Sequence, residues 1–138
     1  MSNIFLLPMK IRHLDSLFEK KVNEYLTKEV GITASQFMIL FGVFKCDGLS
    51  QKTIASHLKI TESAVSRQIE NMVKVGYLER QVNPDNRREH ILGLTTKGRK
   101  VFIEAEESLL EMEEKFFAIL SKEETKQFRN ILNKLLQQ

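Results

Sequence analysis

The stretch from residue 50 to residue 98 constrains the fold of this 138-residue chain most strongly, because its hydrophobic period changes twice. Two segments with helical spacing come first, and each is preceded by an N-cap residue type, Ser50 or Thr61. Beyond Gly76 the period becomes two, over two short runs that flank a polar loop. Helical spacing resumes after Thr95. The order of helix, helix, hairpin and helix predicts a winged helix-turn-helix.

The two predicted helices of this stretch each have one apolar face. The apolar positions are Ile54, Ala55 and Leu58 in the first helix, and Val65, Ile69 and Met72 in the second. Gly76, preceded by Lys74 in the last turn, predicts where the second helix ends. The polar side of the second helix is left for solvent or a ligand. Its residues are Glu62, Ser63, Ser66, Arg67 and Glu70.

The polar loop between the two predicted strands is the candidate wing. Residues 83–86, Asn-Pro-Asp-Asn, suit a tight turn, and Arg87 and Arg88 follow at once. A basic tip beside a recognition helix suits the narrow minor groove of DNA, where negative potential is concentrated. The predicted DNA-contacting residues are Gln51, Thr61, Glu62, Ser63, Ser66, Arg67, Arg87 and Arg88. Alternatively, Arg67 is an ordinary solvated helix residue, and the wing arginines protect an exposed strand edge.

With these motifs in order, the chain resembles the MarR family, the multiple-antibiotic-resistance type of bacterial transcriptional regulator. The resemblance rests on the run from Thr33 to Phe37, the helix-turn-helix, the junction from Gly76 to Arg80, the wing, and the run from Leu94 to Gly98. It implies a mainly helical fold with a small β-hairpin wing. It further implies a homodimer that binds a pseudo-palindromic operator and is released by a small ligand or by oxidation.

Two positions depart from the family pattern. The family usually has Asp two residues before the wing arginine that Arg88 matches, but here Asn86 takes that place and Asp85 lies one residue earlier. An Asp-Arg pair that orients the wing is therefore not expected. Lys59 replaces the glycine common between the two motif helices, so a turn with positive φ is not assumed there.

Length and charge agree with one domain, covering residues 1–138. The net charge is +3, and residues 50–100 hold ten basic against five acidic residues, whereas the remainder holds 11 basic and 13 acidic. The positive charge therefore lies on the winged motif, as a phosphate-facing module needs, although a solvated helical face gives the same count. The DNA-binding core is expected over about 33–98, and helices for dimerisation over about 1–30 and 99–138.

The flanking segments are predicted to be helical and strongly apolar. Apolar residues recur from Ile11 to Tyr25, and again from Phe102 to Leu120. Ser121 and Glu124 form a predicted capping box before a last helix. These helices either fold back on their own core or pair with a second copy, and the resemblance favours the dimer. A helix from about Ser35 to Phe44 is apolar almost all round and is expected to be the central buried helix.

Other functional sites have little support in the sequence. Cys46 is expected to be a small buried residue rather than an oxidation sensor, with Asp47 beside it disfavouring a thiolate. The three histidines are scattered, so neither a metal site nor a cofactor is predicted. The longest apolar run, residues 37–44, is far below the roughly 20 residues of a membrane span, and a cytoplasmic protein is expected.

Two other classes of function fit the sequence less well than a DNA-binding regulator. A winged-helix module that binds protein or RNA remains the alternative, but it has no need of positive charge on both the recognition helix and the wing. An enzyme is disfavoured, because the sequence contains no nucleophile-base pairing and no glycine-rich phosphate loop. An effector pocket is expected between the winged core and the helical dimer region.

Overall fold

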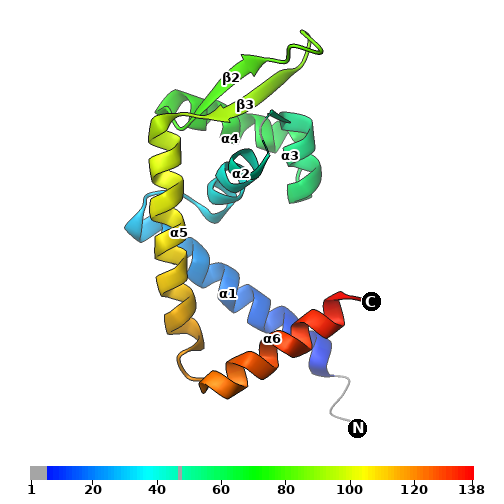
Figure 1. Ribbon diagram of the computed structural model, residues 1–138, viewed down its shortest axis with the longest axis vertical. Coiled ribbons are helices and arrows are strands. Elements are labelled where there is room, and N and C mark those ends of the chain that lie inside the picture. Colours follow the sequence, from blue (N-terminus) through cyan, green and yellow to red (C-terminus); the bar gives the residue numbers. More distant parts are fainter. Residues whose placement is uncertain (1–5, 47) are drawn as a thin grey trace.

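The computed structural model describes residues 6–46 and 48–138, so Asp47 lies outside the described residues. The elements in chain order are α1 (Leu7–Glu29), α2 (Ala34–Lys45), β1 (Leu49–Ser50), α3 (Gln51–Leu58), α4 (Glu62–Val75), β2 (Leu78–Val82), β3 (His90–Leu94), α5 (Thr96–Phe117) and α6 (Lys122–Leu136). An upper lobe holds α2, α3, α4 and the sheet, and α5 descends from it to the level of α1 and α6 (Figure 1). The predicted fold class, mainly helical with a small winged sheet, is confirmed.

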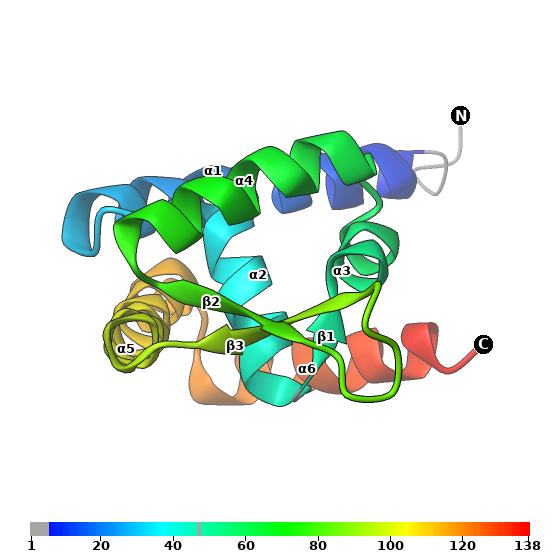
Figure 2. The same cartoon turned by 90° about the horizontal axis from the view of Figure 1, so that it is seen from above.

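The sheet has three antiparallel strands in the order β1-β3-β2, where the sequence predicted two. The hairpin pairs Leu78 with Leu94, and β1 pairs Leu49 with Leu92. A strand of two residues is too short to show a period, which is why β1 was missed. Seen from above, α4 and the β2–β3 hairpin lie across the top of the lobe, with α3 near the N-terminal end of α4 (Figure 2).

The predicted helix boundaries are confirmed by their caps. Ser50, Thr61, Thr95 and Ser121 each accept a hydrogen bond from a backbone N–H in the first turn of the following helix. Gly76 ends α4 with φ of 90°. Lys59 ends α3 with φ of 54° and ψ of 38°, so the positive-φ turn is present although the residue is not glycine.

The core lies between α2, α3, α4, the sheet, α5 and the C-terminal end of α1. Its fully buried side chains include Leu26, Ile32, Ile39, Leu40, Val65, Ile69, Met72, Leu78 and Phe102. The expectation that α2 is the central buried helix is met only in part, because Ile39, Leu40 and Val43 are buried but the rest of its circumference is not covered. Its exposed large apolar side chains are Met38, Phe41 and Phe44, with 45%, 36% and 37% of their surface accessible.

The lower part of the molecule is held together mainly by α1 and α5. Phe18 of α1 meets Phe116 of α5 edge-to-face, with ring centroids 5.2 Å apart. Lys115 Nζ donates to Tyr25 Oη at 2.9 Å and to Glu111 at 2.7 Å, and these bonds, the Glu111 bond first, raise the pKa of Lys115. Helix α6 has no buried residue. None of the helices in residues 6–46 and 48–138 is long and apolar enough to cross a membrane.

Candidate nucleic-acid interface

Helix α4 is fixed in the lobe by its apolar face and presents its polar face outward. Val65, Ile69 and Met72 are completely buried. On the other side, Glu62, Ser63 and Arg67 are exposed, and Ser66 is half-buried. The predicted polar side of the recognition helix is therefore available to a ligand along its first two turns.

The N-terminal end of α4 carries a cluster of hydroxyl groups. Thr61 Oγ1 accepts from the Ala64 N–H at 3.2 Å and lies 3.1 Å from Ser63 Oγ in a second hydrogen bond. The first N–H groups of a helix give its N-terminus partial positive charge. The hydroxyl groups and the partial positive charge together make this end of α4 suited to binding phosphate oxygens.

Helix α3 is joined to α4 by a tight turn that does not depend on glycine. The Ile60 N–H donates to the Ala55 carbonyl at 3.2 Å, which closes the end of α3 around Lys59. Gln51, predicted to contact DNA, is the first residue of α3 and is half-buried. The Ser50 cap beneath it is supported by Thr53, whose Oγ1 lies 2.8 Å from Ser50 Oγ.

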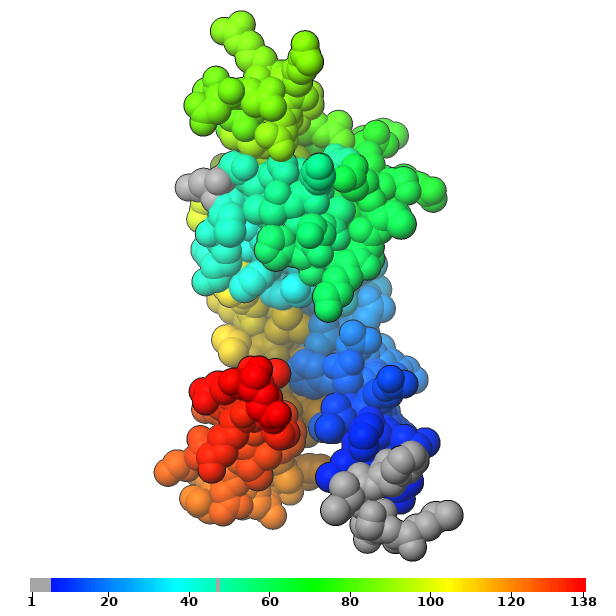
Figure 3. All heavy atoms as spheres, turned by 90° about the vertical axis from the view of Figure 1, so that its right-hand side faces the viewer, coloured from blue at the N-terminus to red at the C-terminus, as the bar shows by residue number. Residues whose placement is uncertain are grey.

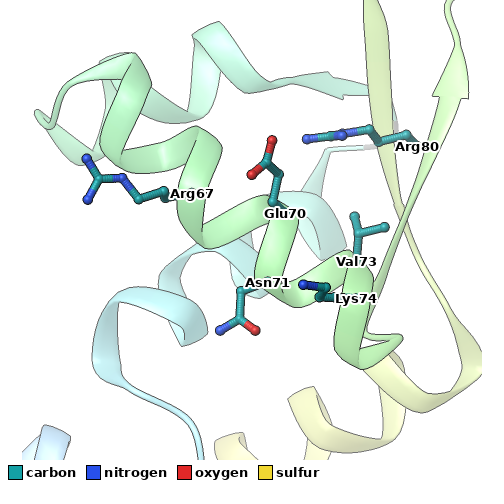
Figure 4. A pocket seen from close by; sticks show the side chains of 6 residues that line it. All are labelled: Arg67, Glu70, Asn71, Val73, Lys74 and Arg80. Atoms are coloured by element: carbon teal, nitrogen blue, oxygen red, sulfur yellow. The ribbon is translucent and has the colours of Figure 1, made fainter.

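A shallow pocket of about 470 Å³ lies between the outer face of α4 and β2. It is lined by Arg67, Glu70, Asn71, Val73, Lys74 and Arg80 (Figure 4). The Glu70 carboxylate points toward Arg80, whereas Arg67 extends away from β2 (Figure 4). Of the residues that line this pocket, only Arg67 was among the predicted DNA-contacting residues. The strand period offered a signal for Arg80, because it shares a sheet face with Leu78, which packs toward α4.

The wing, residues 83–89, is organised by its asparagines. The Asn83 N–H donates to the Glu89 carbonyl at 3.0 Å, and Asn83 Oδ1 accepts from the Asp85 N–H at 3.0 Å. Asn86 Oδ1 accepts from the backbone N–H of Arg88 at 3.2 Å. Asn86 therefore shapes the turn and does not orient the Arg88 guanidinium.

The wing arginines are free of carboxylate partners within the described part of the chain. Arg87 and Arg88 are exposed, and none of the ion pairs found within residues 6–46 and 48–138 includes either of them. The wing projects beyond the body of the molecule (Figure 3). Two guanidinium groups at its tip therefore face solvent without neutralisation.

The predicted site residues thus form two groups and an outlier. Thr61, Glu62, Ser63, Ser66 and Arg67 lie together over the first two turns of α4. Arg87 and Arg88 lie at the wing tip, and Gln51 starts α3. Helix α4 and the wing hairpin lie along the same upper surface of the lobe (Figure 2).

A separate apolar cavity of about 290 Å³ lies between α2 and α3. Its wall includes Met38, Phe41, Leu49, Ile54, Leu58 and Cys46. Cys46 is exposed, so the expectation that it is buried is wrong. The reason is its position as the C-cap of α2, where the chain leaves the helix before β1.

Comparisons with known proteins agree with this geometry. The model of the MarR family matches residues 32–90. The HTH-type transcriptional regulator BilQ of Clostridium symbiosum is 33% identical over 110 residues, which cover 80% of this chain and 76% of that protein. The chain belongs to the MarR family.

Other similarities extend over most of the chain. The uncharacterized HTH-type transcriptional regulator YwoH of Bacillus subtilis is 30% identical over 88% of each chain. The fold matches wild-type MarR of E. coli with a TM-score of 0.86, at 24% identity over 94% of this chain and 96% of that chain. It also matches a mutant of S. aureus MepR, with a TM-score of 0.75 at 27% identity over 99% and 98%.

Membership of the MarR family settles the class of function. The chain is a DNA-binding transcriptional regulator and not an enzyme. The resemblance noted in the sequence is confirmed. Within residues 6–46 and 48–138, no three His, Cys, Asp or Glu side chains are grouped so that they could hold a metal ion.

Proposed function

We propose that this chain is a homodimeric, sequence-specific repressor that binds a pseudo-palindromic operator with α4 and the wing. The observation that carries the proposal is the presence of exposed arginines on two surfaces of one face, Arg67 on α4 and Arg87 with Arg88 on the wing. A mutant of E. coli MarR with the same fold, 24% identical and with a TM-score of 0.78, was solved in complex with operator DNA.

Each surface suits a different part of the duplex. The first two turns of α4 enter the major groove, where Arg67 meets base edges and Ser63 and Ser66 meet bases or phosphates. Glu62 faces the same groove and is suited to accept from a cytosine amino group. Thr61 and Gln51, at the N-terminal ends of α4 and α3, meet phosphates. Arg87 and Arg88 enter the adjacent minor groove.

The dimer is proposed from apolar faces that a single chain leaves uncovered. On α1 the exposed side chains include Leu7, Met9, Ile11, Leu14 and Leu17, and on α6 they include Ile131, Leu132, Leu135 and Leu136. Two helices at the same end of the molecule with so much accessible apolar surface favour association with a second copy (Figure 1). A two-fold dimer places two α4 helices on one face of the DNA.

Release by a small ligand is the second part of the proposed regulation. The cavity between α2 and α3 is the candidate for such a ligand, and it lies inside the winged core and not between the core and the dimer helices, where the sequence placed the expected pocket. Because α3 packs on α4, a shift of α3 is passed to the recognition helix. A ligand must bind the released state more tightly than the DNA-bound state to act in this way. A regulator of this kind works on chromosomal DNA in the cytoplasm.

Selection of duplexes from a random pool, followed by footprinting, tests the proposal. We expect enrichment of a two-fold sequence, with half-sites about 10 bp apart or a multiple of that distance. An RNA hairpin and an unselected duplex serve as competitors. Equal affinity for the selected duplex and for either competitor would contradict sequence-specific DNA binding and favour the protein- or RNA-interaction module.

A further inference from the structure

The C-terminal end of α4 is held by the start of α5, through three consecutive backbone carbonyls. The Val75 carbonyl accepts from Lys97 Nζ at 2.8 Å. The Gly76 carbonyl accepts from Thr95 Oγ1, and the Tyr77 carbonyl accepts from the Thr95 N–H at 3.2 Å. Residues 95–97 therefore satisfy every carbonyl from the last residue of α4 to the residue before β2.

Lys97 supplies a donor that α4 itself cannot supply. The Tyr77 N–H bonds the Met72 carbonyl at 2.8 Å, and the Gly76 N–H bonds the Val73 carbonyl at 3.1 Å. This Schellman arrangement leaves the Val75 carbonyl without a partner in the helix. The Lys97 ammonium donates to this carbonyl, and its positive charge also interacts favourably with the negative end of the helix dipole.

The Lys97 side chain is held in place although it lies at the surface. Its ammonium lies 5.4 Å from the centroid of the Tyr77 ring, within the range of a cation–π contact. Its Cδ lies 3.8 Å from the position a Cβ of Gly76 would take. The side chain therefore spans from α5 across Tyr77 to the end of α4.

Helix α5 connects this junction to the proposed dimer region. Its 22 residues form one helix, about 33 Å long at 1.5 Å per residue. Near its other end, Lys115 and Phe116 contact Tyr25 and Phe18 of α1. The apolar face of α4 fixes the helix in the lobe, and the bonds from Thr95 and Lys97 fix its C-terminal end relative to α5 and so to the dimer helices.

We infer that Lys97 is a positioning residue that fixes the angle of the recognition helix and so determines how well the chain distinguishes its operator from other duplexes. The inference rests on the proposed function. Two α4 helices must fit two half-sites at once, so a small change in their angle weakens the operator complex more than nonspecific binding. Lys97 acts through α4 and needs no contact with DNA.

The test compares Lys97→Met with Lys100→Met. The first removes the donor and the charge but keeps an unbranched apolar chain beside Tyr77. The second removes the same charge from an exposed position one turn along α5. For each variant we measure affinity for the selected operator and for a random duplex over a series of salt concentrations. Urea unfolding reports the stability of each variant.

We expect Lys97→Met to lower the ratio of operator to random-duplex affinity by about 3- to 10-fold, with an unchanged salt slope. Lys100→Met should leave the ratio unchanged. Lys97→Gln, which keeps a neutral donor, should recover part of the loss. Hydrogen exchange at the amides of Gly76, Tyr77 and Thr95 should become faster in Lys97→Met.

Three outcomes would overturn the inference. Equal losses for both duplexes, with a salt slope flattened by about one to two units, would make Lys97 a phosphate contact. If Lys97→Met has the same ratio of operator to random-duplex affinity as the parent, the bond to Val75 does not contribute to distinguishing the operator from other duplexes. If the parent protein binds the selected operator and the random duplex equally well, the proposed function fails. Hydrogen exchange then tests the junction by itself: exchange rates in Lys97→Met that equal those of the parent would show that Lys97 does not hold the end of α4.

Discussion

Gly98 in the first turn of α5 lies directly against the backbone of Tyr77. A Cβ at Gly98 would be 1.9 Å from the Tyr77 carbonyl oxygen and 2.8 Å from its carbonyl carbon. Only a residue without a side chain allows α5 to start this close to β2. The contact also brings Thr95 and Lys97 within hydrogen-bonding reach of the end of α4.

Replacing Gly98 by Ala should therefore destabilise the chain strongly. The clash is with backbone atoms that cannot rotate away, so we expect a loss of about 3 kcal/mol or more in the free energy of unfolding. Gly93→Ala is the matched control, because a Cβ there would meet side-chain atoms at an ordinary 3.5 Å. Urea titration followed by circular dichroism measures both. Similar losses for the two variants would contradict the close contact at Gly98.

Lys59→Gly should stabilise the protein slightly. Lys59 adopts the left-handed conformation, with φ of 54°, which disfavours residues that carry a Cβ. Glycine removes this strain but increases the entropy of the unfolded chain, so we expect a net gain of up to about 1 kcal/mol. The midpoint of urea unfolding checks this. Gly76→Ala, at φ of 90°, should change stability in the opposite direction.

Arg67→Ala and Arg88→Ala should weaken DNA binding in different ways. Arg67→Ala removes a base contact and should cost on the order of 1 to 3 kcal/mol per half-site, with relaxed sequence preference. Arg88→Ala should weaken operator and random duplexes more evenly and flatten the salt dependence by about one to two units. Fluorescence anisotropy over a salt series distinguishes the two. If both variants bind DNA as the parent does, neither Arg67 nor Arg88 contributes to DNA binding.

Asn86→Asp should have little effect on the shape of the wing. The side-chain oxygen of Asn86 accepts from the Arg88 N–H at 3.2 Å, and an Asp carboxylate accepts equally well. The added negative charge stands beside two arginines, so operator affinity should change by less than about threefold. A loss as large as that of Arg88→Ala would show that Asn86 contacts DNA through its amide.

Leu132→Glu should dissociate the proposed dimer. Leu132 lies on the apolar face of α6, and a buried carboxylate at an interface is unfavourable without a partner. Asn130→Glu adds the same charge on the opposite side of α6 and should leave the assembly intact. Sedimentation at micromolar concentration reports the mass of each variant. A parent that sediments as a monomer would refute the dimer itself.

Local patterns were enough to predict the winged motif. An N-cap such as Thr61 and a stripe such as Val65, Ile69 and Met72 depend on residues within a few turns of one another, so the printed order of residues determines them. The same holds for the Gly76 turn and for the capping box of Ser121 with Glu124. The polar face of α4 follows directly from these positions.

Tertiary structure decided what depends on distant partners. The exposure of Phe41 follows from how little of α2 the other elements cover, and β1 exists only because β3 pairs with it. Lys97 meets Val75 across 22 residues of sequence. A one-dimensional pattern encodes which side of a helix is apolar, but it does not encode which neighbour covers that side. The tertiary packing decides which element covers an apolar face, because burial depends on the surfaces that are brought together in space.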